Sequence, residues 1–363
     1  MANTTDDFKR IVLEDISLID VRAPIEYERG AFKHAVNLPI MTDDERHQVG
    51  LTYKEKGNEA ARKLGYQLVS GDTKSKRVKN WLNHIEKNPN TMLYCFRGGD
   101  RSRISQEWMK DEGQDITRLK GGYKAFRNYL IQALDPSYQN STPLLLGGYT
   151  GSGKTILLNK LKNSIDLEGL ANHRGSSFGS YIEPQPSQIN FENNLAYALI
   201  KHKQQGHRHM ILEDEGRHIG KCYIPSSLSE FFKKGNLILM DVPLLRRVEI
   251  TLDEYVHDSQ KRYLNTYGEI GLEKWYSYIS NGIKRIKKRL GGNRYNQVMK
   301  QLKDAYNHQI KTGDQSLHTF WIETILRDYY DPMYQYQIEK RTTPIIFKGD
   351  EQEVFQYLQE YCQ

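Results

Sequence analysis

The chain of 363 residues is long enough for two domains that each bury a core, and its formal charge of +7 favours an anionic partner such as nucleic acid. Its 3 cysteines lie far apart without a C-x-x-C pair, which excludes a disulfide framework and a cysteine zinc site. Because it shows no signal peptide and no apolar run of the ~20 residues that cross a bilayer, we predict a cytoplasmic protein.

In the first half, short apolar runs alternate with helical patterns, which is typical of an α/β fold with parallel strands. Strands are predicted at 16–22 and 91–95. A helix is predicted at 102–113, with Ser102 as its N-terminal cap. The same alternation continues in the second half, so we predict a parallel sheet there as well.

The domain organisation follows from breaks in these patterns. We predict a first domain over 1–133, in which the polar segment 42–69 is too long for a connection and forms a helical insertion. The segment 134–143 contains two prolines and small polar residues without periodicity, and is the predicted linker. The second domain, 144–363, includes a helical region rich in tyrosine and basic residues at 244–330. Its predicted elements are a strand at 143–148, a helix at 154–163, and strands at 209–214, 236–243 and 343–347.

Directly after the second predicted strand, Cys95 begins the stretch C-F-R-G-G-D-R-S. The predicted anion-binding loop around it comprises Arg97, Gly98, Gly99, Arg101 and Ser102. The glycines allow backbone N–H groups to surround an anion, and the following helix directs its positive end to the same place. Comparable surroundings lower a cysteine pKa from about 8.5 to ~3.5–7.5. We therefore predict that Cys95 is a reactive nucleophile, and that Cys222 and Cys362, which lack such surroundings, are inert.

The segment 148–155, G-Y-T-G-S-G-K-T, fits the P-loop pattern G-x-x-x-x-G-K-[ST] in full. The predicted phosphate-binding residues are Gly148, Gly151, Ser152, Gly153, Lys154 and Thr155. Lys154 would reach the terminal phosphate, and the Thr155 hydroxyl would be available to Mg²⁺. Such a loop indicates phosphate binding and leaves hydrolysis of a nucleoside triphosphate open. For the acidic residues 213–215, a metal-bound water and a solvated turn are equal alternatives.

Two further segments have the composition of anion sites. The Gly/Ser-rich loop 172–179 contains His173, Arg174 and Ser176, which suit contacts to phosphate or RNA. The basic run 284–294 follows the aromatic segment 275–280, and RNA contact or a solvated helix face would both account for it. The residues proposed for RNA contact are Lys284, Arg285, Lys287, Lys288 and Arg289.

The order of three segments resembles rhodanese domains: 18–39, the Cys95 loop and 118–130. In that family, the positions of Asp20, Arg22 and Glu26 belong to a structural ion-pair network. Combined with the P-loop, the 172–179 loop and 329–337, the whole chain closely resembles the tRNA 2-selenouridine synthase family.

The resemblance implies a two-step reaction on the wobble 2-thiouridine of tRNA. Geranyl diphosphate first alkylates the sulfur, and selenium from selenophosphate then replaces it. In that scheme Cys95 serves the second step, as a selenium-carrying perselenide. The P-loop residue Lys154 would stabilise the departing diphosphate, with or without Mg²⁺. The enzyme that produces selenophosphate is a further partner implied by the resemblance.

The Cys95 loop departs from single-domain rhodaneses, which commonly read C-x-x-G-x-R-S, by one additional residue. We interpret this residue as room for a bulkier anion such as selenophosphate. The spacing from Cys95 to Arg101 also matches cysteine phosphatases, although Tyr94 stands where those usually have histidine. A phosphatase or sulfurtransferase with a regulatory P-loop module, a nucleoside kinase suggested by 241–248, and a non-enzymatic RNA-binding or persulfide-relay protein remain alternatives.

Overall fold

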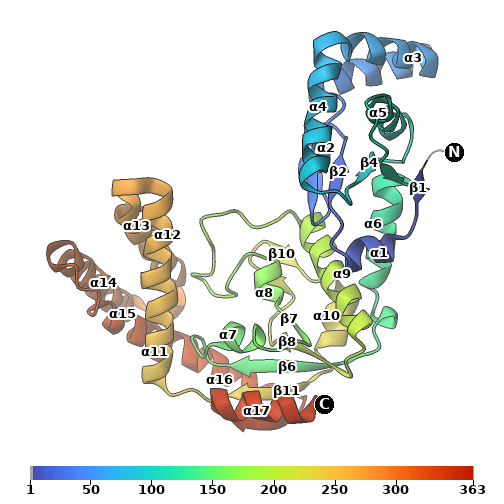
Figure 1. Ribbon diagram of the computed structural model, residues 1–363. Coiled ribbons are helices and arrows are strands. Elements are labelled where there is room, and N and C mark those ends of the chain that lie inside the picture. The colour runs from blue at the N-terminus through green and yellow to red at the C-terminus, as the bar shows by residue number, and fades with distance from the viewer. Residues whose placement is uncertain (1–2, 363) are drawn as a thin grey trace. The chain divides into compact units, whose positions relative to one another are not determined.

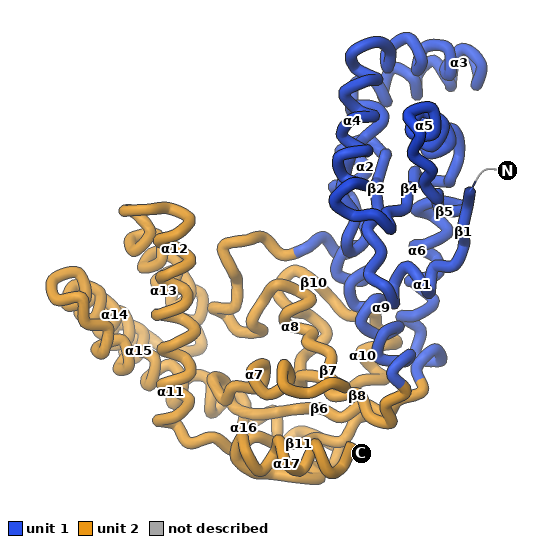
Figure 2. Tube along the Cα trace, viewed as in Figure 1, with its two compact units in different colours: residues 1–139, 186–205 blue, residues 140–185, 206–363 orange. Residues whose placement is uncertain are grey.

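The protein, described over residues 3–362 in a computed structural model, divides into two compact units (Figures 1 and 2). Unit 1 comprises 1–139 together with 186–205, and unit 2 comprises 140–185 together with 206–363. Each unit contains a parallel five-stranded sheet, which confirms the predicted α/β class. Within residues 3–362, no helix is long and apolar enough to cross a membrane.

The sheet of unit 1 has the strand order β1-β5-β4-β2-β3. Its strands are β1 (Thr4–Thr5), β2 (Leu18–Asp20), β3 (Ala35–Asn37), β4 (Met92–Tyr94) and β5 (Thr117–Leu119). Side chains alternate between the two faces of a strand. Leu93 and Cys95 accordingly belong to the apolar cluster under α4 and α5, whereas Tyr94 contacts Phe32 in an aromatic cluster on the other face.

The helices of unit 1 are α1 (Phe8–Leu13), α2 (Pro24–Arg29), α3 (Asp43–Leu68), α4 (Gly71–Lys87), α5 (Asp100–Asp111), α6 (Gly122–Ala133), the short 3₁₀ helix at Pro136–Tyr138, and α9 (Gln188–Gln205). Although α9 lies beyond the P-loop in sequence, it packs on α1 and α6. The Asn193 amide donates a 2.7 Å hydrogen bond to the Ala31 carbonyl and accepts one of 2.7 Å from Arg127.

Helix α5 begins earlier than its sequence suggested, at Asp100, and its N-cap residue is Gly99. The prediction that Ser102 caps this helix was therefore wrong. Gly98 has a φ of +68°, which turns the chain into the helix three residues sooner. Ser102 consequently lies inside the first turn, where its hydroxyl donates a 3.1 Å hydrogen bond to the Gly99 carbonyl.

The sheet of unit 2 has the order β12-β11-β6-β8-β7. Its strands are β6 (Thr142–Gly148), β7 (Ser164–Ile165), β8 (His209–Glu213), β11 (Asn236–Met240) and β12 (Ile345–Gly349), and β9 (His218–Ile219) pairs separately with β10 (Cys222–Tyr223). The helices beside this sheet are α7 (Lys154–Leu158), α8 (Leu167–Leu170), α10 (Ser226–Phe232) and α17 (Glu351–Tyr361). The sheet core contains Leu144, Leu146, Ile211, Ile238 and Met240, packed against α7 and α17.

Helix α7 covers only the first half of the predicted range 154–163. The Ser164 hydroxyl donates hydrogen bonds to the carbonyls of Leu158 (2.7 Å) and Leu161 (2.9 Å). These bonds satisfy carbonyl groups that a longer helix would have used, and the chain turns into β7.

The predicted helical region of unit 2 has a core of its own, around Trp275, Ile279, Ile283 and Trp321. Its helices are α11 (Leu244–Leu252), α12 (Ser259–Tyr267), α13 (Gly271–Leu290), α14 (Gly292–Thr312), α15 (His318–Ile325) and α16 (Asp331–Glu339), with a 3₁₀ turn at Gly268–Ile270. Two π-helical turns, Asp253–Asp258 and Leu326–Tyr330, interrupt the sequence of α-helices. Turns of this kind are frequent near functional sites.

Candidate active sites

Cys95 lies immediately after β4, at the carboxyl edge of the sheet of unit 1, where open α/β sheets bind ligands. The residue is 3% exposed. Its Sγ atom lies 3.2 Å from the Ser102 hydroxyl and 3.9 Å from the Gly99 carbonyl oxygen. The thiol therefore faces the first turn of α5, whose free N–H groups favour negative charge.

A second pair of glycines packs against the backbone of the Cys95 loop. Gly121 and Gly122 have φ values of +73° and +58°, and the Tyr123 N–H donates a 2.9 Å hydrogen bond to the Cys95 carbonyl. A Cβ atom on Gly122 would lie 2.3 Å from that carbonyl oxygen and 2.5 Å from the Gly98 nitrogen. The double glycine that follows β5 is therefore required for the close approach of the two loops.

We expect Gly122→Ala to lower the melting temperature of the protein and to displace the Cys95 loop. The added methyl group overlaps backbone atoms at a positive φ, which costs about 1–3 kcal/mol, or several degrees in Tm. Gly99→Ala is the matched control, because a Cβ there has no atom within 4 Å and φ is −87°. A thermal scan in which both variants lose the same Tm would contradict this account.

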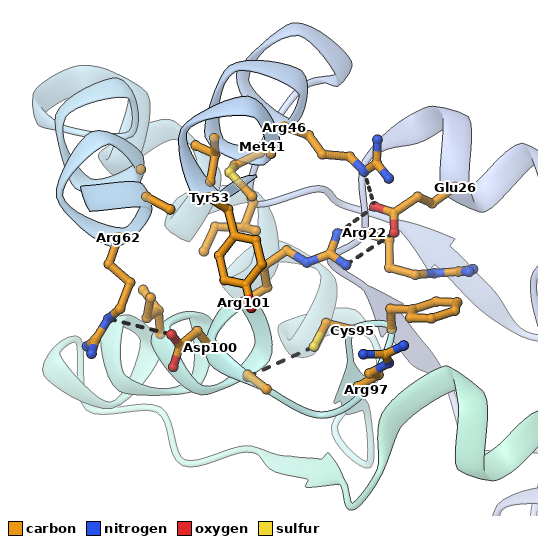
Figure 3. Close-up of a pocket in the computed structure, with 18 of the residues that line it drawn as sticks. Arg22, Glu26, Met41, Arg46, Tyr53, Arg62, Cys95, Arg97, Asp100 and Arg101 are labelled. Atoms are coloured by element: carbon orange, nitrogen blue, oxygen red, sulfur yellow. Dashed lines mark hydrogen bonds and ion pairs between the residues drawn. The ribbon is translucent and has the colours of Figure 1, made fainter. Parts of the chain in front are cut away.

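The two arginines of the loop have different environments. Arg101 makes two hydrogen bonds to Glu26, of 2.5 Å and 3.1 Å, and Arg46 lies 3.0 Å from the same carboxylate (Figure 3). Burial alone would raise the pKa of Glu26, but the hydrogen bond and charge of Arg101 lower it. Arg97 is exposed beside the Phe96 ring. Arg101 thus braces the loop through Glu26, and Arg97 is the more accessible cation.

The other two residues of the proposed ion-pair network form a separate buried pair. The Arg22 Nη2 atom lies 2.6 Å from Asp20 and 2.8 Å from the Gly30 carbonyl. The Arg22 guanidinium also lies 4.0 Å from the centre of the Tyr123 ring. These contacts join β2 to α2 and α6, and their role is structural.

A cavity of about 960 Å³ opens in front of Cys95. Its cationic lining consists of arginines of the Cys95 loop and of α3, including Arg46, Arg62, Arg97 and Arg101. Its apolar lining includes Ile40, Met41, Val49, Tyr53 and Val69. The volume lies in the range of small-molecule sites, which is 300–1,000 Å³. Unit 1 therefore presents a cysteine thiol at a large cavity that is lined by both cationic and apolar side chains.

The P-loop of unit 2 lies between β6 and α7, which is the structural context that its sequence pattern requires. The Lys154 ammonium donates a 2.9 Å hydrogen bond to the Gly148 carbonyl across the loop. Gly151 has a φ of +80°, and a Cβ there would lie 2.5 Å from the Thr251 hydroxyl oxygen. The Ser152 hydroxyl is buried without a hydrogen-bond partner among the described residues. Gly153 and Thr155 flank Lys154 and are partly exposed.

Reasoning from the sequence missed two residues that contact this loop, Tyr334 and Arg247. The Tyr334 hydroxyl lies 2.5 Å from the Gly148 nitrogen, which donates to it, and the Tyr334 ring packs on Tyr149. Arg247 donates two 2.7 Å hydrogen bonds to Asp331 and lies 3.3 Å from the Thr150 carbonyl. Resemblance to known families is all that distinguishes the segments 241–248 and 329–337 in the sequence, whereas in the structure both contact the P-loop.

The acidic residues 213–215, at the end of β8, make contacts with other residues of unit 2. Asp214 accepts a 2.5 Å hydrogen bond from Arg341, and Glu213 is buried and accepts one of 3.0 Å from the Leu167 N–H. Burial and the nearby Glu215 raise the pKa of Glu168 to about 9, and burial raises the pKa of Glu215 as well. Among the described residues no group of three His, Cys, Asp or Glu side chains could hold a metal ion. At a P-loop, Mg²⁺ is held by a hydroxyl such as that of Thr155, by phosphate oxygens and by water, so Mg²⁺ binding stays a prediction.

The Glu168–Glu215 pair predicts a pH-dependent stability. The pKa of Glu168 in the folded protein, about 9, lies above its ordinary value of 4.5. The contribution of Glu168 to the free energy of unfolding is therefore complete below pH 4.5 and is lost as the pH rises toward 9. We expect the Tm to fall between pH 6 and pH 9, and to fall less in Glu168→Gln, whose amide stays neutral. Glu269→Gln, on the surface, is the control. An equal fall in wild type and Glu168→Gln would rule out this pair as the cause.

The loop 172–179 packs against the helical region. His173 is buried and its Nδ1 accepts a 3.1 Å hydrogen bond from the Gly175 N–H. The Arg174 guanidinium lies over the rings of Tyr181 and Tyr255, at 4.3 Å and 4.8 Å. The Ser176 hydroxyl is hydrogen-bonded to the Tyr255 hydroxyl at 2.9 Å. All three predicted residues have structural contacts in this loop, and their role toward phosphate or RNA stays a prediction.

The basic run forms the last turns of α13, and its five cationic side chains are exposed: Lys284, Arg285, Lys287, Lys288 and Arg289. Arg285 also donates a 2.6 Å hydrogen bond to the Ser177 carbonyl. The aromatic segment before the run is not free for base stacking. Trp275 is 0% exposed and donates to the Tyr255 carbonyl, while Tyr276 packs on Tyr306.

A narrow apolar pocket lies beside the P-loop. It is lined by Thr150 of the loop, by Phe178, and by Trp321, Ile322 and Leu326 of the helical region. Both π-helical turns contribute to it, through Tyr255 and Tyr330. Its volume is about 20 Å³, so its side chains must move apart before it can admit a ligand.

The other two cysteines have no comparable surroundings. Cys222 is 1% exposed, and burial raises the pKa of its thiol. Burial raises the pKa of Cys362 in the same way. Neither lies in a glycine loop at the end of a central strand, so Cys95 has the chemically distinct position.

Comparison with known proteins agrees with both units. A family model described as "tRNA 2-selenouridine synthase AAA domain" matches residues 141–363, and one for the rhodanese-like domain matches 4–129. The tRNA 2-selenouridine synthases of Sulfurovum sp. (strain NBC37-1), Hydrogenovibrio crunogenus and Shewanella frigidimarina are 52%, 48% and 46% identical to this chain. The matches cover 98–99% of this chain and of each relative. The chain therefore belongs to the tRNA 2-selenouridine synthase family.

Proposed function

We propose that the protein converts the wobble 2-thiouridine of tRNA to 2-selenouridine in two steps, one at each anion site. The observation that supports this best is the pairing, in one chain, of a cysteine in a large cavity with a separate P-loop. Unit 2 would alkylate the sulfur with geranyl diphosphate, and unit 1 would replace the alkylated sulfur with selenium from selenophosphate.

The surroundings of the P-loop suit a diphosphate that carries a hydrocarbon chain. The loop glycines and Lys154 would hold the diphosphate, and the ammonium would stabilise its charge as the carbon–oxygen bond breaks. The adjacent pocket, with Phe178, Trp321 and Leu326, offers apolar contacts to a hydrocarbon chain. In this step the thiouridine sulfur forms a bond to the geranyl carbon, and diphosphate leaves.

The second step needs no change of oxidation state. Selenium in selenophosphate is already at the level of a selenide, whereas a perselenide on Cys95 would require an oxidant. We therefore assign Cys95 a redox-neutral role as a nucleophile. Its thiolate forms a bond to C2 of the S-geranylated base and geranylthiolate leaves. The selenium atom of selenophosphate then displaces Cys95 from C2, and water cleaves the phosphorus–selenium bond to release phosphate.

Mass analysis of tRNA nucleosides tests this function. Purified protein is incubated with 2-thiouridine tRNA and each donor alone or both together. The proposal predicts the geranylated nucleoside with geranyl diphosphate alone, 2-selenouridine with both donors, and no new nucleoside with selenophosphate alone. Formation of 2-selenouridine without the geranyl donor would contradict the order of steps, and an unchanged tRNA mass under all conditions would contradict the function.

We expect tRNA binding to weaken steeply with salt, and less steeply once the basic end of α13 is neutralised. Each phosphate contact adds about 0.7–0.9 to the slope of log K against log salt concentration. Replacing Lys287, Lys288 and Arg289 by glutamine is thus expected to reduce the slope by about 2–3. The exposed pair Lys233 and Lys234, changed in the same way, is the control. Binding titrations at several salt concentrations that give one slope for all three proteins would exclude α13 from the RNA contact.

A further inference from the structure

One side of the Cys95 cavity has no role in holding an anion. The loop amides and the arginines account for the cationic part of the cavity. Much of the remaining lining comes from α3, which is 26 residues long and yet buries only Ala61, and which contributes apolar side chains as well as the cations Arg46 and Arg62. Gly57, with a φ of +83° and a ψ of −175°, divides α3 into two arms, and residues of both arms line the cavity.

The apolar side chains of α3 that line this cavity are largely uncovered by protein. Leu51, Tyr53 and Tyr66 are 44%, 59% and 41% exposed, and all three line the cavity. Figure 3 shows Tyr53 and Met41 on the same side of the site as Arg101. Exposed apolar area grouped in a cavity is typical of a surface that binds an apolar ligand.

The apolar side continues to the nucleophile. Cys95 belongs to the same cluster of buried apolar residues as Ile40, Met41 and Val69, against which Val49 of α3 packs. A ligand whose reacting atom meets the thiol can therefore extend directly along α3. Its charged part would lie toward Arg97, in the loop that follows Cys95.

We infer that the α3 side of the Cys95 cavity binds the geranyl chain of the S-geranylated nucleotide during selenation. The inference rests on the proposed function, in which the chain is attached to the very sulfur that leaves when C2 reacts. A hydrocarbon group bonded to that sulfur must lie within a few bonds of the Cys95 thiol. The cationic side complements the phosphates of RNA and selenophosphate, so one cavity matches both parts of this substrate.

This assignment gives the geranyl group a second function besides improving the leaving group. Its contacts with α3 would recognise the alkylated tRNA and distinguish it from 2-thiouridine tRNA and from the 2-selenouridine product. Geranylthiolate would leave along the same apolar surface. Selenation should consequently depend on the length of the alkyl chain.

The test uses the full-length protein and anticodon stem-loop RNA that is chemically S-alkylated beforehand, with methyl, dimethylallyl or geranyl groups. Selenophosphate is supplied, and KM and kcat for 2-selenouridine formation are measured. Wild type is expected to show a KM at least tenfold lower for the geranylated than for the methylated RNA. The double variant Leu51→Ser/Tyr53→Ser is expected to lose most of this preference.

The matched control is Glu55→Ser/Lys56→Ser, on the same helix, at exposed positions outside the cavity. It should retain the wild-type preference, and both double variants should geranylate 2-thiouridine tRNA at the wild-type rate. Equal KM values for all alkyl groups in wild type, or an unchanged preference in Leu51→Ser/Tyr53→Ser, would overturn the inference. If wild type instead forms no 2-selenouridine from any alkylated RNA, the proposed function itself is wrong.

Discussion

Cys95→Ser is expected to stop the reaction at the S-geranylated nucleoside. The serine hydroxyl is far less acidic than a thiol and cannot displace geranylthiolate at a useful rate, whereas the P-loop is untouched. With both donors present, 2-selenouridine should fall by at least about 10³-fold, since removal of a covalent nucleophile commonly costs that much. Nucleoside mass analysis should show the geranylated base accumulating in its place.

The nucleophilic role of Cys95 can also be measured in the wild-type protein. With geranylated RNA and no selenophosphate, it should release up to one geranylthiol per protein and form a covalent adduct between Cys95 and RNA. Cys222→Ser, which changes a buried thiol outside the loop, should behave as wild type in both assays. Normal 2-selenouridine formation by Cys95→Ser would remove Cys95 from the chemistry.

Lys154→Ala is expected to abolish geranylation. The ammonium lies 2.9 Å from the Gly148 carbonyl, within the loop that would enclose the diphosphate. Loss of one group that stabilises developing negative charge typically lowers kcat by about 10²–10³. The rate of geranylated nucleoside formation from 2-thiouridine tRNA and geranyl diphosphate measures this effect.

The control for that change is Lys162→Ala, an exposed lysine shortly after the P-loop helix, which should leave the rate unchanged. A similar loss in both variants would indicate a general electrostatic effect on tRNA binding. A normal rate in Lys154→Ala would show that the P-loop does not hold the geranyl donor.

Local patterns were sufficient to predict the parallel sheets and the position of Cys95 and the P-loop. Apolar runs such as 91–95 and 143–148 are short, follow polar segments that contain proline or asparagine, and lead into glycine-rich loops, so their strand character and the loops after them follow from the sequence. The ends of helices could not be predicted as well from the sequence. The early start of α5 depends on the positive φ of Gly98, and the short α7 depends on hydrogen bonds from Ser164.

Contacts between distant segments could not be predicted from one sequence. Tyr334 and Arg247 reach the P-loop from 186 and 97 residues away, measured to Gly148 and Thr150. The packing of α9 on α1 and α6 likewise joins segments that are far apart in the sequence, as in the hydrogen bond from Asn193 to the Ala31 carbonyl. The cavity beside Cys95 depends on the fold of α3 about Gly57, whereas the sequence indicated only a helical insertion.

The assignment of alkylation to unit 2 and of selenation to unit 1 is tested most directly by supplying the S-geranylated tRNA. Wild type, Lys154→Ala and Cys95→Ser are each given pre-geranylated tRNA and selenophosphate, and 2-selenouridine is measured by nucleoside mass analysis. The account predicts wild-type amounts of product from Lys154→Ala and none from Cys95→Ser. Loss of product in Lys154→Ala, or its formation by Cys95→Ser, would contradict the assignment of alkylation to unit 2 and selenation to unit 1.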